Sequence, residues 1–256
     1  MQIDLNCDMG EGFGVYSLGQ DDAIIAHVSS INIACGFHAG DPLVMERTVR
    51  LAKERGVAVG AHPGLPDLLG FGRRDMACSP EEIAAYLTYQ IGALQAFCTA
   101  QGVRLGHVKP HGALYNRAAR DEQLVRVMAR ALARIDRGLL LVGLAGRDNR
   151  RLAAIAAEEG LTMVFEAFPD RAYTPEGALV SRRLPGAMIH DPEAAAARAL
   201  RMVCDGVVEA VDGALVPLAA QTLCVHGDNP QGTALAAIIR ARLEAAGVAV
   251  RPLRPA

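Results

Sequence analysis

The feature that most constrains the fold is a regular alternation of short apolar stretches with longer helical stretches along the chain. Seven stretches have the apolar or alternating character of β-strands and end in glycine, proline or polar turn residues. We predict strands at residues 2–10, 29–34, 57–61, 139–144, 162–166 and 221–225, with another at the start of 105–116. Helices are predicted at residues 42–55, 79–100, 121–137, 147–159, 192–211 and 233–246. Because strands separated by helices form right-handed βαβ units, we expect a parallel sheet.

Seven such units within 256 residues favour a closed barrel over an open doubly wound sheet. Apolar residues make up 51% of the chain, enough for a sizeable core, and no linker-like stretch divides it. We therefore expect an α/β fold with one domain, residues 1–256: an irregular (β/α) TIM-like barrel of about seven parallel strands. Residues 174–189 are interpreted as a loop with a short hairpin, and residues 248–251 as a terminal strand.

Charge and composition exclude several classes of partner. The chain carries 26 Lys and Arg residues against 28 Asp and Glu residues, which gives no electrostatic reason to bind nucleic acid or an anionic membrane. Residues 1–10 do not resemble a secretory leader, and no stretch of 18 uncharged apolar residues occurs. The six cysteines include no Cys-x-x-Cys pair, which argues against a disulfide framework or zinc knuckle. We expect a cytoplasmic protein with a small-molecule or protein partner.

Residues 105–116 contain the densest group of chemically active side chains. If the extended backbone persists to Pro110, then His107, Lys109 and His111 share one face of the strand. Polar residues also follow the other predicted strands, and in a parallel barrel such positions converge on one rim. The rim residues are Asp8 and Glu11, His38 and Asp41, His62 and Asp67, Lys109 and His111, Asp170 and Arg171, and His226 and Asp228.

Two kinds of chemistry would use this rim. In general acid/base catalysis, carboxylates and imidazoles move protons while Lys109 and Arg171 hold an anionic group of the substrate. In metal-assisted hydrolysis, Asp8, His38 and His62 would bind a divalent metal that activates water. The sequence leaves both open.

Several motifs together resemble the LamB/YcsF family. They are NCDMGE at 6–11, NIACGFHAGDP at 32–42, GAHP at 60–63, GFGRR at 70–74, VKPHGALYN at 108–116, DRAY at 170–173 and VHGD at 225–228. The resemblance implies a barrel similar to the glycoside hydrolase/deacetylase superfamily, in which a metal often lies among one Asp and two His. It also implies ATP-dependent hydrolysis of the 5-oxo-L-proline lactam to L-glutamate, the 5-oxoprolinase reaction, performed with two further subunits, B and C.

The resemblance and the rim residues lead to one set of expected roles. We expect Asp8 or a neighbouring histidine to activate water, and a histidine to protonate the leaving nitrogen. The expected catalytic residues are Asp8, His38, His62, Lys109 and His111. The expected substrate-binding residues are Asn6, Glu11, Arg73, Arg74, Asp170, Arg171, His226 and Asp228. Since the sequence has no Walker-type loop and no Gly-x-Gly-x-x-Gly opening a helix, we expect ATP to bind mainly on the partner subunits.

Two alternatives remain from the sequence. The chain would act alone as a metal-dependent deacetylase or amidohydrolase, or it would be a non-catalytic subunit that binds and presents the substrate. The number of proton-transfer groups at the rim argues against the non-catalytic alternative.

Overall fold

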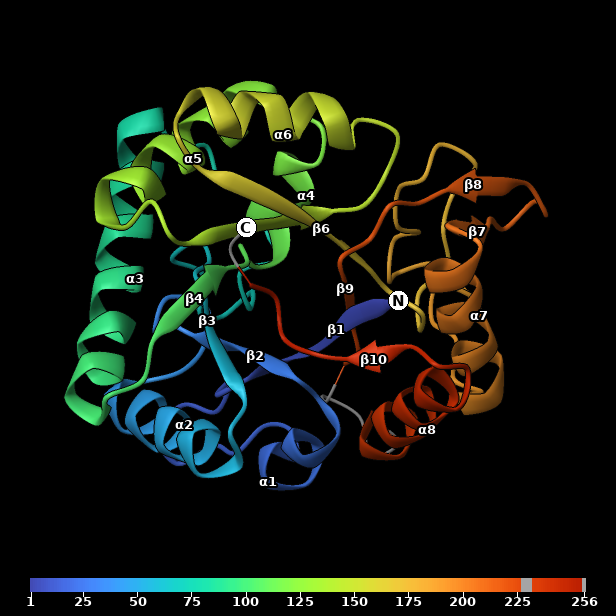
Figure 1. Cartoon of the computed structure of the whole chain (residues 1–256). Coiled ribbons are helices and arrows are strands. Elements are labelled where there is room, and N and C mark those ends of the chain that lie inside the picture. Colours follow the sequence, from blue (N-terminus) through green and yellow to red (C-terminus); the bar gives the residue numbers. More distant parts are fainter. Residues whose placement is uncertain (227–231, 255–256) are drawn as a thin grey trace.

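A closed parallel β-barrel forms the centre of the molecule (Figure 1). The structure is a computed structural model that describes residues 1–226 and 232–254. Within these residues, strands pair in the order β10-β1-β2-β3-β4-β5-β6-β9, and a further β1–β9 pairing closes a ring of seven parallel strands. The predicted TIM-like barrel is therefore confirmed.

Helices pack around the outside of this ring (Figure 1). The strands are β1 (Gln2–Met9), β2 (Ser30–Ala34), β3 (Ala58–His62), β4 (Leu105–Val108), β5 (Leu140–Leu144), β6 (Thr162–Ala167), β7 (Val207–Glu209), β8 (Leu215–Pro217), β9 (Thr222–Cys224) and β10 (Ala249–Val250). The helices are α1 (Asp21–Ile24), the short 3-10 helix η1 (Ile25–His27), α2 (Pro42–Arg55), α3 (Pro80–Gln101), α4 (Gly112–Ala118), α5 (Glu122–Ile135), α6 (Asn149–Glu158), α7 (Pro192–Cys204) and α8 (Gly232–Ala245). None of the described helices is both long and apolar enough to cross a membrane.

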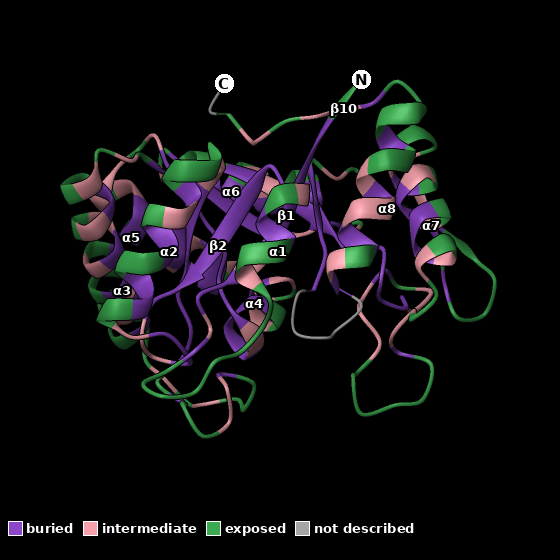
Figure 2. Cartoon of the chain, turned by 90° about the horizontal axis from the view of Figure 1, so that it is seen from below, coloured by how far each residue is buried: buried purple, intermediate pink, exposed green. Residues whose placement is uncertain are grey.

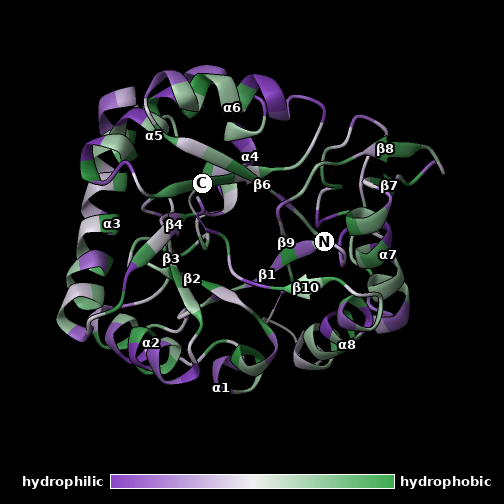
Figure 3. Cartoon of the chain, viewed as in Figure 1, coloured by the Kyte–Doolittle hydropathy of each residue, from purple (hydrophilic) through white to green (hydrophobic). Residues whose placement is uncertain are grey.

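The two faces of β1 show how the barrel is built. Ile3, Leu5 and Cys7 belong to the apolar core. The alternate residues Asp4 and Asn6 are also buried, but they form hydrogen bonds inside the barrel to polar side chains of other strands. The central strands are mostly buried, whereas the surrounding helices carry exposed residues (Figure 2). The helices contain both hydrophilic and hydrophobic residues (Figure 3). A polar barrel interior costs stability unless its groups are hydrogen-bonded, and here Asp4 and Asn6 both have such partners.

Local sequence signals account for the main helix boundaries. Asp41 caps α2, because its Oδ1 accepts hydrogen bonds from the backbone N–H groups of Leu43 and Val44, both at 2.9 Å. Gly56 ends α2 with a positive φ of 65°. Ser79 and Glu82 form a capping box at the start of α3.

Two predicted boundaries were wrong. The helix predicted at 192–211 ends at Cys204, and β7 then pairs with β8 in an antiparallel hairpin. Gly206, with a φ of 66°, makes the turn that an alanine-rich pattern did not reveal. The turn predicted after Pro110 contains the short helix α4, which begins at Gly112. The terminal strand predicted at 248–251 is confirmed as β10, parallel to the start of β1.

Candidate active site

The carboxyl ends of the barrel strands open into one cavity of about 780 Å³, a volume in the range of small-molecule sites. Its walls include Asp8, Glu11, His62, Lys109, His111 and His226. The predicted convergence of polar residues from β1, β3, β4 and β9 is therefore present in the structure.

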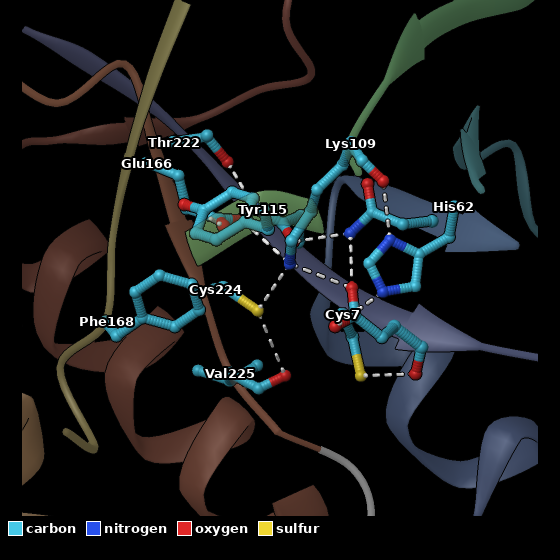
Figure 4. Close-up of polar contacts among 12 residues, drawn as sticks. Cys7, His62, Lys109, Tyr115, Glu166, Phe168, Thr222, Cys224 and Val225 are labelled. Atoms are coloured by element: carbon cyan, nitrogen blue, oxygen red, sulfur yellow. Dashed lines mark hydrogen bonds and ion pairs between the residues drawn. The ribbon is translucent and has the colours of Figure 1, made fainter. Parts of the chain in front are cut away.

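Lys109 is buried at the base of the cavity between two carboxylates. Its Nζ lies 2.9 Å from Asp8 Oδ1 and 3.0 Å from Glu166 Oε1, and it also contacts Cys224 Sγ at 3.2 Å. Figure 4 shows Lys109 with His62 on one side and Glu166, Phe168 and Cys224 on the other. Burial alone would lower the pKa of Lys109, but the two carboxylates and the Cys224 thiol raise it well above its usual range. Lys109 is thus a fixed cation at physiological pH.

Asp8 is the carboxylate that faces both Lys109 and the histidines. Its Oδ2 lies 3.3 Å from His62 Nε2. Burial would raise the pKa of Asp8, yet His62 and Lys109 hold it well below its usual range. Asp8 is therefore an ionised carboxylate, the form needed to accept a proton from water.

A buried hydrogen-bond network inside the barrel holds Asp8 and Lys109 in position. Asn32 Nδ2 donates to Asp8 Oδ1 at 2.8 Å and to Asn6 Oδ1 at 2.7 Å, and Asn6 Nδ2 donates to Glu166 Oε1 at 2.8 Å. Tyr115 Oη donates to the other oxygen of Glu166 at 2.9 Å. The amide of Asn6, expected to bind substrate, is thus fully used inside the barrel as a positioning group.

Three histidines and one glutamate form a second group, which we call the histidine cluster: Glu11, His38, His62 and His111. One ligand atom from each of the four lies within 4.8 Å of the others. His38 stacks on His111 with ring centroids 3.7 Å apart. Glu11 Oε1 lies 3.8 Å from His38 Nε2 and 3.9 Å from His111 Nδ1.

Backbone carbonyls fix which ring nitrogens carry hydrogen in this cluster. His62 Nδ1 donates to the carbonyl of Lys109 at 2.7 Å, and His111 Nε2 donates to the carbonyl of Phe71 at 2.8 Å. In their neutral forms, His62 Nε2 and His111 Nδ1 therefore direct lone pairs at each other across 2.9 Å. A positive charge between them, a proton or a metal ion, would remove this repulsion.

The environment of His38 also favours a positive charge in the histidine cluster. Both of its ring nitrogens are buried without a hydrogen-bond partner among the described residues, a costly arrangement for a polar group. Burial lowers the pKa of His38 and of His111 well below the usual value, so both rings favour the neutral form that binds metals. Imidazole nitrogens with one carboxylate suit a divalent transition metal, and the residues present therefore fit one.

The opposite wall of the cavity holds an Asp–His pair. His226 Nδ1 donates to Asp170 Oδ2 at 2.6 Å, its Nε2 accepts from Arg182 Nη2 at 2.6 Å, and its ring stacks on Phe168. Burial would raise the pKa of Asp170, but His226, Arg171 and Arg182 lower it. In this arrangement Asp170 holds the Nδ1–H of His226, and Nε2 accepts the hydrogen bond from Arg182.

The remaining predicted residues differ in their positions. Arg73 lines the cavity, with its guanidinium 4.9 Å from the ring centre of Phe71. Arg74 instead binds Asp67 within its own loop. Arg171 lines the cavity but donates to the carbonyls of Val180 and Ala187. The predicted residue Asp228 lies outside the described residues.

Sequence reasoning missed several residues that shape the site, namely Asn32, Tyr115, Glu166, Phe168 and Arg182. Asn32 and Tyr115 belong to the quoted motifs, and Glu166 ends a predicted strand, so their positions carried a signal. Arg182 lies in a segment whose sequence has no clear helix or strand pattern. Its contact with His226, which follows β9, depends on the geometry of that loop.

A closed parallel barrel with a polar site at the carboxyl ends of its strands defines a (β/α)-barrel protein whose site lies where barrel enzymes hold their active sites. The sequence model of the LamB/YcsF family matches residues 3–256. The chain belongs to the LamB/YcsF family, as its motifs predicted.

Full-length relatives agree with this assignment. A Thermococcus onnurineus protein that is named as the A subunit of 5-oxoprolinase is 54% identical over 253 residues, 99% of this chain and 98% of that protein. A protein of Symbiobacterium thermophilum with the same name is 56% identical over 249 residues, 97% of this chain and 94% of that protein. A crystal structure of a lactam utilization protein from Thermus thermophilus has 53% identity and a TM-score of 0.91, and the match covers 99% of this chain and 100% of that one.

Proposed function

We propose that this chain performs ring opening within the ATP-dependent 5-oxoprolinase reaction. The substrate is the lactam of 5-oxo-L-proline, the product is L-glutamate, and ATP is cleaved to ADP and phosphate with the help of subunits B and C. The observation that carries the proposal is the buried Lys109, held between Asp8 and Glu166 at the base of a cavity lined with histidines. Relatives that are more than half identical over their full length bear the name of the 5-oxoprolinase A subunit.

The chemistry of the lactam explains why these groups are needed. A lactam is a resonance-stabilised amide, so hydrolysis needs a polarised carbonyl, a positioned water and a proton for the leaving nitrogen. Ionised Asp8 accepts the proton of the attacking water, and the fixed charge of Lys109 stabilises the negative charge that the activated lactam carries. Glu166 holds Lys109 in position, and Tyr115 in turn orients Glu166.

ATP enters this proposal through the partner subunits. Phosphorylation of the lactam oxygen would weaken the amide resonance before water attacks. Cleavage of the C–N bond would then leave an acyl phosphate, and a second water would release phosphate and L-glutamate. Because the sequence lacks a recognisable nucleotide-binding loop, subunits B and C hold the ATP and this chain receives the activated lactam. The need for ATP assigns the reaction to the cytoplasm in this proposal.

We also propose that the histidine cluster binds a divalent metal. Its ligands would be Glu11, His38, His62 and His111. Asp8, a ligand in the sequence-based hypothesis, instead forms an ion pair with Lys109. Such a metal would act as a Lewis acid that polarises an oxygen of the substrate or of water. This chain's residues would still perform the proton transfers at Asp8 and at the Asp170–His226 pair.

The test is glutamate release from 5-oxoproline by the purified chain, with and without ATP and with and without subunits B and C. The proposal expects glutamate only in the complete mixture containing ATP. Glutamate release by the chain alone without ATP, or no release in any mixture, would contradict the proposal.

The histidine cluster favours one alternative function, a metal-dependent amidohydrolase that acts alone. That alternative requires a stoichiometric metal, activity in the absence of ATP and loss of activity with a chelator. The same set of mixtures, repeated with a chelator, separates the two functions.

A further inference from the structure

His107 is a buried histidine of β4 to which the proposed function gives no role. Its side chain lies inside the barrel, where the residue is 2% exposed and its Nε2 is 2.7 Å from Asn32 Oδ1. Burial, followed by the nearby charge of Lys109, lowers the pKa of His107 to about 3. His107 is therefore neutral at physiological pH, and only one of its ring nitrogens carries hydrogen.

The carboxylate of Asp8 determines which nitrogen that is. Asn32 Nδ2 lies 2.8 Å from Asp8 Oδ1 and 2.7 Å from Asn6 Oδ1. An ionised carboxylate only accepts hydrogen bonds, so the NH₂ group of Asn32 must face Asp8 and its oxygen must face His107. His107 Nε2 therefore carries the hydrogen and donates to Asn32, which in turn donates to Asp8.

The strand register brings these side chains together at one level of the barrel. Asp8 of β1 pairs with Asn32 of β2, Asn32 pairs with Gly60 of β3, and Gly60 pairs with His107 of β4. His107 thus reaches Asn32 across the whole width of β3. A Cβ atom at Gly60 would overlap the His107 ring, so this contact requires a glycine at that position.

We propose that His107 is a positioning residue that, through Asn32, holds Asp8 in the orientation in which it accepts the proton of water. This inference rests on the role of Asp8 in the proposed function. Without His107, the buried oxygen of Asn32 loses its donor, which favours rotamers that turn the Asn32 amide away from Asp8. Asp8 then loses the N–H bond that fixes its Oδ1.

The test uses variants of the full-length chain in the complete mixture with subunits B and C and ATP. His107→Phe keeps a ring but removes the donor, whereas His107→Gln keeps an N–H donor. Gly60→Ala displaces the ring without removing any polar group. Gly92→Ala is its matched control, because a Cβ at this exposed helical glycine meets no atom within 4 Å.

The expected effect is a loss of kcat with little change in KM, because a misplaced catalytic group acts on the transition state more than on substrate binding. His107→Phe and Gly60→Ala should each lower kcat for glutamate formation about ten- to a hundredfold. His107→Gln should recover most of that loss, and Gly92→Ala should keep the wild-type kcat. In an Asn32→Ala background, His107→Phe should lower kcat no further, because the donor has lost its route to Asp8.

A second measurement is independent of activity and of the variants' stability. Ring ¹⁵N NMR of the purified wild-type chain, assigned with His107→Gln, should show His107 as the neutral tautomer with hydrogen on Nε2 at pH 7. Hydrogen on Nδ1 would overturn the inference.

The kinetic outcomes separate this inference from the proposed function. If His107→Phe keeps the wild-type kcat, or if its loss adds in full to that of Asn32→Ala, His107 does not position Asp8 and the proposed function stands. If the wild-type chain forms no glutamate in the complete mixture, the proposed function is wrong and the inference falls with it.

Discussion

The two walls of the cavity are built in different ways. The histidine cluster lies at or just beyond the ends of β1 to β4, and backbone carbonyls orient two of its rings. The Asp170–His226 wall lies at the ends of β6 and β9, and its contact to Arg182 comes from the segment between Tyr173 and Asp191. The first wall presents ring nitrogens to one point, whereas the second depends on side-chain contacts between a strand end and a loop. Lys109 lies between the two walls and serves both.

The largest expected effect comes from removing the charge between the walls. Lys109→Met leaves Asp8 and the fully buried Glu166 without their cation, which should cost about 3–5 kcal/mol of unfolding free energy. Turnover in the complete enzyme should fall by about 10²–10³, the loss typical of one oxyanion-stabilising group. Lys53→Met is the matched control, because Lys53 is exposed and donates to the carbonyl of Gln101. Urea unfolding and glutamate release measure both effects, and equal stability of the two variants would contradict the assigned role.

The second prediction tests whether the histidine wall is a metal site. At a Zn²⁺, Ni²⁺ or Mn²⁺ concentration a hundred times the dissociation constant, metal binding should stabilise the folded state by about 2.7 kcal/mol. This stabilisation should raise Tm by roughly 5–10 °C. His38→Asn should abolish this rise, and His190→Asn, a change at an exposed histidine, should keep it. Differential scanning calorimetry and metal analysis after dialysis provide the measurement. If no metal changes Tm, the proposed metal site is wrong. A proton between His62 Nε2 and His111 Nδ1 would then explain their close contact.

The third prediction concerns the other wall and its dependence on pH. The folded-state pKa of Asp170 is lowered, so its stabilising contribution is present above the unfolded value and is lost as pH falls through the folded value. Asp170→Asn should therefore destabilise the protein by about 1–3 kcal/mol at pH 7 and by progressively less as the pH falls below about 4. Chemical unfolding at several pH values tests the sign. A destabilisation that grows in acid would contradict the proposed ionised Asp170.

The smallest effect is expected where the second wall is anchored. Arg171→Gln loses the hydrogen bonds to Val180 and Ala187 and should cost about 1 kcal/mol. Hydrogen exchange should accelerate around residues 178–189, while exchange in β1 to β4 should not change. Arg183→Gln, a change at an exposed arginine of the same segment, serves as the control. Equal exchange in both variants would show that Arg171 does not anchor the segment.

The sequence predicted the barrel and the convergence of its rim residues for a physical reason. Residues such as Asp8, His62 and Lys109 follow strands whose alternation is visible, and parallel strands bring such residues to one rim. The same logic applies to Asp170 and His226, which follow β6 and β9 and meet at the rim.

The second wall and the interior network were less predictable. Arg171 and Arg182 have the same charge and lie in the same polar region of sequence, so only the folded loop shows which one reaches His226. Asn6 and Glu166 meet across the barrel although 160 residues separate them, a contact that no local pattern encodes. The end of α7 was missed although Asp205 and Gly206 are a typical turn signal, because the alanine-rich helical pattern was extended through them.

The most direct test of the central claim is glutamate formation by the complete ATP-containing mixture with Asp8→Asn in place of the wild-type chain. Asparagine keeps the shape of Asp8 but cannot accept the proton of water, and ADP release reports separately whether subunits B and C still work. The account predicts that glutamate formation falls at least about a hundredfold while the variant remains folded and still binds its partners. Glutamate formation at the wild-type rate would contradict the account and would reduce this chain to a subunit that only binds the substrate.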